Sequence, residues 1–404
     1  MVAKGVHLRL IALALTTLLL TSSATPEEHW WLQDLGFSET NLDGSGVRVA
    51  VIDTGIDDDH PDLAGMVIGG ADFSGIGTPD GTQPVGPGGF HGTMVSSLIA
   101  GQGMISGGVI GVAPGVELLA VSVGLGVDGA DTDAQVAQAI IWSVDNGASV
   151  INLSLSRNSE RWPASWDEAF LYAFESDVVI VAASGNREAQ SYATAPATIP
   201  GVLSVTAVDK AGNVNSSAGA SGIGVAVAAP GIDMLGSFPG GEIETWEGSS
   251  AAAPIVTGLV ALMRQADPAA SANDIIQRVV STAVDLGEPG FDGIYGYGLI
   301  DPIAAVDSSA VSDSNPLGSL AQWVELYRPA QASDDEAELI VPTLPGVEAA
   351  ADESAAEPEI READPGLNPL TYLLLPIALL LVALIFNSLR RGKKKQASTT
   401  KEGS

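Results

Sequence analysis

Residues 47–55 read VRVAVIDTG, an apolar run that ends in an acid, a threonine and a glycine. Valine, alanine and isoleucine follow one another there with little polar alternation, which is typical of a strand buried on both faces of a parallel sheet. Similar apolar runs lie at 118–123, 150–155, 178–182 and 202–208. The sequence therefore predicts a mostly parallel β-sheet.

Helical patterns separate these strands. Val136, Ile140 and Val144 recur at every fourth position of 132–146, and Gly147 follows as a stop signal. Further helices are expected at 165–175, 250–265 and 271–282. This alternation predicts an α/β fold with a doubly wound sheet flanked by helices, in which functional residues gather at the carboxyl ends of the strands.

The composition excludes several classes of protein. The 404 residues include 49 acidic and 17 basic side chains, a net charge of −32 that argues against nucleic acid as a partner. The absence of cysteine excludes disulfides, thiolate metal sites and a thiol nucleophile. With 46% hydrophobic and 16% charged residues, disorder throughout the chain is excluded as well.

The N-terminal end has the pattern of a secretory signal. Lys4 and Arg9 precede an apolar run at 10–20, and small residues follow up to Ala24. We expect a signal peptide at 1–24 that is cleaved after Ala24. An uncleaved membrane anchor is the alternative.

The C-terminal end has the pattern of a membrane anchor. No charged residue occurs from 365 to 389, and a basic cluster follows at 390–395. The sequence predicts a transmembrane helix at 367–389 and a cytoplasmic tail at 390–404, because basic flanks stay in the cytoplasm. The chain is then a single-pass type I protein of the cell membrane, with its globular part outside the cytoplasm.

An acidic segment separates the globular part from this anchor. Residues 334–364 contain 11 acids and one base, too little apolar surface to offset the chain entropy of folding. We expect a globular domain at 25–308 and an extended, disordered acidic stalk at 309–366. Trp323 and Tyr327 are expected to pack back on the globular domain.

Four short segments carry the polar residues expected at strand and helix ends. They are VIDTGID at 51–57, HGTMV at 91–95, AASGN at 182–186 and GSSAAAP at 248–254. In this order they resemble the subtilisin-like (subtilase) serine protease family. The resemblance covers about residues 30–301 and includes HPDL at 60–63 and GVAP at 111–114. It implies a subtilisin-like fold and hydrolysis of polypeptide substrates.

The resemblance assigns catalytic roles to individual residues. Ser250 would be the nucleophile, His91 the base that takes its proton, and Asp53 the carboxylate that orients the imidazole. The Asn186 side chain and the Ser250 N–H would form the oxyanion hole. His29 is expected at the surface and His60 in a structural turn, while the acids at 57–59 are the alternative carboxylates.

The resemblance also suggests where a substrate binds. The polypeptide would add as a strand between two edges of the cleft. The residues implied are Gly124 and Leu125 on one edge, Ser154, Leu155 and Ser156 on the other, and Gly185 beside them. Thr194 and Ala195 map near the pocket floor, where no acid indicates a preference for basic side chains.

A metal ion is not required by this chemistry. Asp62 matches a calcium ligand of the family, but the companion loop at 103–107 lacks the usual asparagines. A structural calcium ion therefore remains an open alternative. The order of signal, protease, stalk and anchor resembles that of the mycosins, which carry disulfides absent from this chain. A catalytically silent member that binds peptides is the alternative function.

Overall fold

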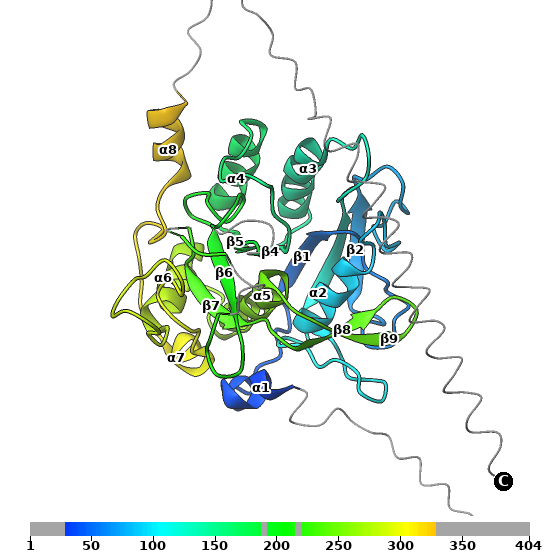
Figure 1. The fold of residues 1–404 in the computed structure, drawn as a ribbon, viewed down its shortest axis with the longest axis horizontal. Coiled ribbons are helices and arrows are strands. Elements are labelled where there is room, and N and C mark those ends of the chain that lie inside the picture. Colours follow the sequence, from blue (N-terminus) through cyan, green and yellow to red (C-terminus); the bar gives the residue numbers. More distant parts are fainter. Residues whose placement is uncertain (1–28, 187–191, 215–219, 223, 329–404) are drawn as a thin grey trace, which may run out of the picture. The chain divides into compact units, whose positions relative to one another are not determined.

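The computed structural model describes residues 29–186, 192–214, 220–222 and 224–328 (Figure 1). The predicted signal peptide, transmembrane helix and cytoplasmic tail lie outside these residues, as does most of the predicted stalk. Within the described residues, no helix has the length and apolar character needed to cross a membrane.

A seven-stranded parallel sheet forms the centre of the domain, as predicted. Its order is β2-β3-β1-β4-β5-β6-β7. The strands are β1 Arg48–Asp53, β2 Val67–Asp72, β3 Glu117–Ser122, β4 Val150–Leu153, β5 Val179–Ala183, β6 Leu203–Val208 and β7 Val227–Pro230. Because β1 lies between β3 and β4, the strand order reverses at β1, and the carboxyl ends of β1 and β4 open on the same crevice.

Helices cover both faces of this sheet. The α-helices of the described residues are α1 Trp30–Asp34, α2 His91–Ala100, α3 Thr132–Asp145, α4 Ser165–Glu175, α5 Ser249–Ala266, α6 Ala272–Thr282, α7 Pro302–Asp307 and α8 Leu320–Tyr327. Of these, α8 packs on α4, and α7 packs on α5 and α6. A separate antiparallel hairpin consists of β8 Met234–Phe238 and β9 Glu242–Trp246. The four predicted helical segments are confirmed as α3, α4, α5 and α6.

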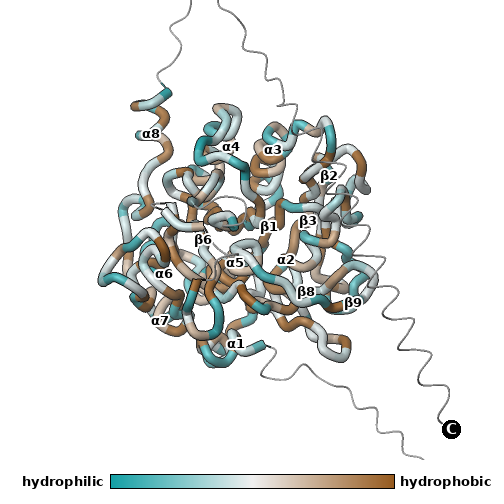
Figure 2. Tube along the Cα trace, in the orientation of Figure 1, coloured by the Kyte–Doolittle hydropathy of each residue, from teal (hydrophilic) through white to brown (hydrophobic). Residues whose placement is uncertain are grey.

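The alternation along β1 divides the core in two. Val49 and Val51 belong to a buried cluster shared with α2, α5 and α6, whereas Ala50 and Ile52 belong to one shared with α3 and α4. Figure 1 shows α3 and α4 on one side of the sheet and α2 and α5 on the other. Hydrophobic residues follow the strands and the inner helix faces, and hydrophilic residues lie mainly in peripheral loops (Figure 2).

The ordered chain continues beyond the domain boundary predicted at 308. Residues 309–328, here called the C-terminal strap, run over the domain and end in α8. Leu320 is buried in the core cluster beside α4, and the Trp323 ring lies 4.4 Å from that of Trp162, measured between centroids. The aromatic packing of Trp323 expected from the sequence is therefore confirmed, and the boundary moves to at least 328 because this packing buries apolar surface.

Asp62 closes the loop at 102–110 through hydrogen bonds. One carboxylate oxygen accepts the Met104 N–H at 2.7 Å, and the other accepts the Val109 N–H at 2.8 Å and the Ser237 hydroxyl at 2.9 Å. Asp62 is fully buried. A calcium ligand must direct free lone pairs at the cation, but here hydrogen-bond donors face the carboxylate. Asp62 therefore does not fit the role of a calcium ligand that the resemblance implied.

We predict that Asp62→Asn lowers the free energy of unfolding by about 3 kcal/mol, because an amide cannot accept all of these donors. Calcium and a chelator should give the same melting midpoint in the parent protein. The measurement is thermal unfolding in a Ser250→Ala background, which removes self-digestion if the expected nucleophile is correct.

Asp209→Asn is the matched control, since its carboxylate accepts two backbone N–H groups, of Ala211 and Asn213, in an exposed turn. Asp209→Asn should lower the free energy of unfolding only slightly. A calcium-dependent rise in the midpoint of the parent that Asp62→Asn abolishes would make Asp62 a ligand after all.

Candidate active site

Four of the predicted site residues meet at the crevice where the strand order reverses. Asp53 is the last residue of β1, and Ser154 directly follows β4. His91 is the first residue of α2, and Ser250 lies in the first turn of α5. The structure therefore brings together residues that are 197 positions apart in the chain, from 53 to 250.

Partly buried His91 is hydrogen-bonded to Asp53. Nδ1 of His91 lies 2.9 Å from both carboxylate oxygens of Asp53, which is fully buried. Thr54 fixes this arrangement, because its N–H donates to Asp53 at 2.7 Å and its hydroxyl accepts the Gly92 N–H at 3.0 Å. A Cβ atom at Gly92 would lie 2.2 Å from the Gly55 carbonyl oxygen, so only glycine lets α2 approach β1 this closely.

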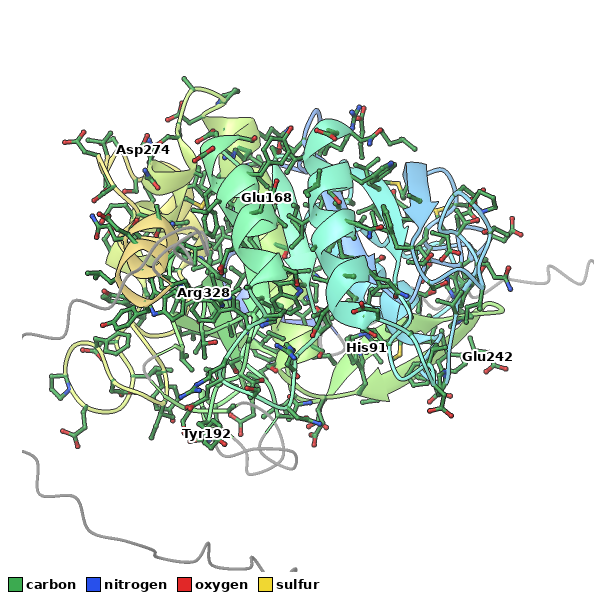
Figure 3. All side chains as sticks on the ribbon, turned by 90° about the horizontal axis from the view of Figure 1, so that it is seen from above. His91, Glu168, Tyr192, Glu242, Asp274 and Arg328 are labelled. Carbon is green, nitrogen blue, oxygen red and sulfur yellow. The ribbon has the colours of Figure 1, made fainter. Side chains whose placement is uncertain are left out.

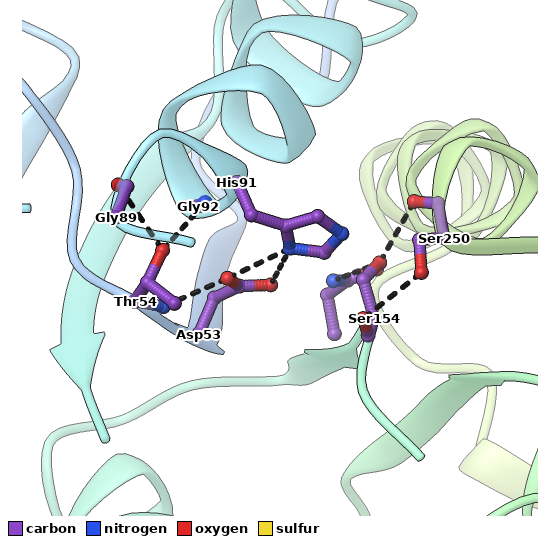
Figure 4. A network of polar contacts seen from close by, with 8 residues as sticks. Asp53, Thr54, Gly89, His91, Gly92, Ser154 and Ser250 are labelled. Carbon is purple, nitrogen blue, oxygen red and sulfur yellow. Dashed lines mark hydrogen bonds and ion pairs between the residues drawn. The ribbon is translucent and has the colours of Figure 1, made fainter. Parts of the chain in front are cut away.

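The environment of His91 favours its protonated form. Burial lowers the pKa of the imidazole, but the charge of Asp53 and the hydrogen bond to it raise the pKa by more, so that the pKa lies above the ordinary 6.5. The Trp246 ring packs edge-on against the imidazole with a centroid distance of 5.6 Å. These contacts leave Nε2 as the ring nitrogen available to a nucleophile (Figure 4).

Ser250 and Ser154 hold each other by two hydrogen bonds. The Ser250 hydroxyl donates to the Ser154 carbonyl at 3.1 Å, and the Ser154 hydroxyl donates to the Ser250 carbonyl at 3.0 Å. Pro254 explains the second bond. In a regular helix the N–H of residue 254 would bond the Ser250 carbonyl, but proline has no N–H, so this carbonyl is free to accept Ser154.

A buried polar chain behind Ser154 was missed by the sequence analysis. The Thr257 hydroxyl donates to the Asn152 side chain at 2.9 Å, and the Asn152 amide donates to the Ser154 hydroxyl at 3.0 Å. All three residues are buried. The signal that could have revealed the chain is a polar residue inside an apolar strand and another inside an apolar helix, since buried polar groups need partners.

Asn186 is held in place by the residue before Ser250. Its side-chain oxygen accepts the Ser249 N–H at 3.0 Å and the Ser249 hydroxyl at 3.1 Å. With its oxygen bonded, the amide NH₂ group is the end left to donate toward the crevice. Gly248 makes room, because a Cβ there would lie 2.9 Å from the Asn186 nitrogen.

The residues predicted to form the substrate edges differ in whether their main-chain groups are free to bind a ligand. Leu155 and Ser156 keep their main-chain groups open, because no hydrogen bond among the described residues uses them. Gly124 does not, since its N–H donates to Gln135 at 2.7 Å and its carbonyl accepts the Thr132 hydroxyl at 3.0 Å. Gly124 is therefore corrected from an edge residue to a structural turn.

Leu125 and Gly185 also lie in internally bonded turns. The Leu125 N–H donates to the Val123 carbonyl at 2.9 Å. The Gly185 N–H donates to Ser249 at 3.1 Å, and its carbonyl accepts the Ala220 N–H at 2.7 Å. Gly185 has φ near +99°, so it shapes the turn before Asn186 without offering these groups to a ligand.

The other two histidines among the described residues, His29 and His60, have structural roles. His60 is buried, accepts the Asp62 N–H at 3.1 Å on Nδ1 and lies 3.2 Å from the Glu242 carbonyl through Nε2. His29 is buried rather than exposed as expected, and its Nε2 accepts the Ile110 N–H at 3.0 Å. The alternative carboxylate Asp57 accepts the Gly240 N–H at 2.8 Å, so His91 keeps Asp53 as its partner.

Comparisons with known proteins identify relatives of this chain. A model of the subtilase family matches residues 44–298. Fervidolysin of Fervidobacterium pennivorans is 36% identical over 69% of this chain and 44% of its own length, so the chain spans less than half of that relative. Subtilisin BL of Lederbergia lenta is 39% identical over 65% of this chain and 92% of its own length.

Solved structures give the same result. The crystal structure of fervidolysin, described as a keratinolytic enzyme related to subtilisin, aligns with a TM-score of 0.61 and 33% identity over 70% of this chain and 46% of that chain. The MycP3 protease from the type VII (ESX-3) secretion system aligns with a TM-score of 0.57 and 30% identity over 71% of this chain and 89% of that chain. The chain therefore belongs to the subtilase family of serine endopeptidases.

Proposed function

We propose that this chain hydrolyses peptide bonds through Asp53, His91 and Ser250, with a covalent acyl-enzyme intermediate. The observation that carries the proposal is the Asp53–His91 contact, which presents Nε2 of the imidazole toward the first turn of α5 (Figure 4). Asp53 holds the tautomer in which Nδ1 carries the proton, so that Nε2 can accept one from Ser250.

The Ser250 hydroxyl must turn from the Ser154 carbonyl toward Nε2 before it attacks. Breaking one neutral hydrogen bond costs about 1 kcal/mol, which is less than a tenfold effect on rate. Catalytic hydrogen bonds are often long or absent before substrate binds. The resting bond to Ser154 is therefore compatible with an active nucleophile.

The negative charge that develops on the attacked carbonyl oxygen needs donors. The Asn186 NH₂ group and the Ser250 N–H supply them, and Ser250 lies at the positive end of the α5 dipole. The substrate adds as an extended strand along the open main-chain groups of Leu155 and Ser156. Thr194 and Ala195, both buried, form the floor of the pocket beside it.

A catalytically silent, peptide-binding protein is the second candidate. It is favoured by one observation, that the Ser250 hydroxyl donates to Ser154 instead of His91. The small cost of that bond and the raised pKa of His91 favour the enzyme. A fluorophosphonate separates the two candidates, because it reacts only with an activated serine.

We also propose that the enzyme acts outside the cytoplasm, as a type I membrane protein held by the predicted helix at 367–389. The uncharged run at 365–389 and the basic cluster behind it support this orientation. The likeness to a protease of a type VII secretion system is compatible with it.

We predict that Ser250→Ala lowers peptide hydrolysis by at least about 10⁴-fold and abolishes fluorophosphonate labelling, because the nucleophile is lost. His91→Ala should give a similar loss, and the double variant should be no worse, since the residues act as a unit. Ser176→Ala, at an exposed serine after α4, is the control and should leave both readouts unchanged. Near-normal turnover of Ser250→Ala would show that Ser250 is not the nucleophile.

We predict that the rate of fluorophosphonate labelling rises with pH and that its midpoint lies above 6.5. The reason is that Asp53 raises the pKa of His91, and only the neutral imidazole can accept the Ser250 proton. The measurement is the second-order labelling rate of the free enzyme between about pH 5 and pH 9, spanning the ordinary histidine pKa. A midpoint below 6.5 would show that burial, rather than Asp53, dominates the site.

We predict that protease added to intact cells releases the catalytic domain by cutting between 333 and 364. A tag placed after Ser404 should stay protected, because the basic cluster holds the tail in the cytoplasm. Immunoblots against the domain and the tag measure both outcomes, and detergent-lysed cells are the control in which the tag is cut. Digestion of the tag in intact cells would reverse the orientation.

A further inference from the structure

The C-terminal strap contacts both segments that form the proposed substrate pocket. The first pocket segment, residues 154–162, begins at Ser154 and includes the open main-chain groups of Leu155 and Ser156. The second pocket segment, residues 194–201, begins at the floor residues Thr194 and Ala195. Neither segment is a helix or strand. Their positions therefore depend on the groups that bind them from behind.

The two pocket segments are bonded to each other. The Arg157 N–H donates to the Ala195 carbonyl at 2.8 Å, and the Ala195 N–H donates to the Ser159 carbonyl at 2.9 Å. The Thr198 hydroxyl donates to the Glu160 carbonyl at 2.7 Å. A displacement of one segment is therefore transmitted to the other.

The strap holds the first pocket segment through Arg328. Its guanidinium donates to the Trp162 carbonyl at 2.9 Å and pairs with Asp167 at 3.1 Å, while Asp167 also accepts the Trp162 indole N–H at 2.8 Å. The same guanidinium lies 5.8 Å from the Trp162 ring and 5.4 Å from the Trp323 ring. One side chain thus binds the end of this segment by charge, hydrogen bond and stacking.

The strap holds the second pocket segment at its other end. The Asn315 amide donates to the Gly201 carbonyl at 2.9 Å, and the Gly201 N–H donates to the Leu317 carbonyl at 3.2 Å. Between these two attachments lies an open cavity of about 650 Å³, lined by Trp162, Thr198, Leu317 and Trp323 among others. Leu320 and Trp323, which lie between Leu317 and Arg328 in the chain, pack on the domain as well, so the strap is attached along this whole length.

We propose that the C-terminal strap sets the substrate preference of the protease by bracing both pocket segments, with Arg328 and Asn315 as positioning residues. The inference rests on the proposed function, because the pocket is defined by it. Arg328 lies away from His91 (Figure 3), so its loss should widen or loosen the pocket without disturbing the catalytic side chains. Hydrolysis should slow more for substrates whose side chain fills the pocket than for substrates whose side chain does not reach its floor.

The test compares full-length Arg328→Ala and Asn315→Ala with the wild type in detergent. Leu326→Ala is the matched control, because it also removes a side chain from the strap but one that is 71% exposed. Arg328→Lys keeps the charge but loses the forked, stacking geometry of the guanidinium. It should therefore retain only part of the wild-type preference for phenylalanine. Each protein is assayed on two peptides that differ only in having phenylalanine or alanine before the scissile bond.

We expect the preference for phenylalanine over alanine, as a ratio of kcat/KM values, to fall about tenfold in Arg328→Ala. Labelling by a small fluorophosphonate, which does not fill the pocket, should stay within about twofold, because Ser250 is untouched. Hydrogen exchange should become faster in residues 154–162 and 194–201 of Arg328→Ala and stay unchanged in Leu326→Ala.

Two results would overturn the inference. One is an unchanged ratio with unchanged exchange in both pocket segments. The other is a loss of labelling equal to the loss of peptide hydrolysis, because the strap would then act on the nucleophile. A wild-type enzyme that does not label counts against the proposed catalytic chemistry instead, and the exchange comparison still decides whether the strap braces these segments.

Discussion

In the seven-stranded sheet, β1 lies between β3 and β4, and this order brings the carboxyl ends of β1 and β4 to one crevice. Every functional side chain depends on that placement. Asp53 ends β1, Ser154 follows β4, and the N-termini of α2 and α5 supply His91 and Ser250 above them. A different strand order would leave the same residues too far apart to react.

The crevice stays ordered because its polar groups have partners. Asp53 accepts from Thr54 and His91, Ser250 exchanges two bonds with Ser154, and Asn186 accepts two from Ser249. His91 and Ser249 belong to helices, and Thr54 and Ser154 directly follow β1 and β4. Such contacts limit the reorganisation needed when charge develops on the substrate, which is the main source of catalytic power in sites of this kind.

Much of the fold could be predicted because its central strands and main helices have strong apolar patterns. The edge strands could not. β2 contains two glycines and is partly exposed, so it lacks a continuous apolar run. β7 is apolar and buried, but it is only four residues long and ends in Pro230, a residue that rarely occurs inside a sheet. The sequence predicts stalk for the strap because the residues that its apolar side chains contact lie near 162–174, far away in sequence.

Motifs in the sequence predict that Asp53, His91 and Ser250 lie together, as the structure shows, but they do not reveal which main-chain groups are already bonded. Gly124 reads as an edge residue in the sequence, and only the positions of Gln135 and Thr132 reveal that its N–H and carbonyl are already bonded. The double role of Ser154 was hidden for the same reason. This role depends on Pro254, which has no N–H to bond the Ser250 carbonyl. The carbonyl is therefore free to accept the Ser154 hydroxyl on the other side of the crevice.

Arg328 is the place where a pulling force on the C-terminal part of the chain would first act on the domain. The chain continues beyond this residue, so tension along it reaches the domain first at the Arg328–Asp167 pair and the stacked rings of Trp323 and Trp162. These contacts adjoin the loop after β4 rather than the sheet. Force on the C-terminal side would therefore distort the neighbourhood of the substrate before it strains the core.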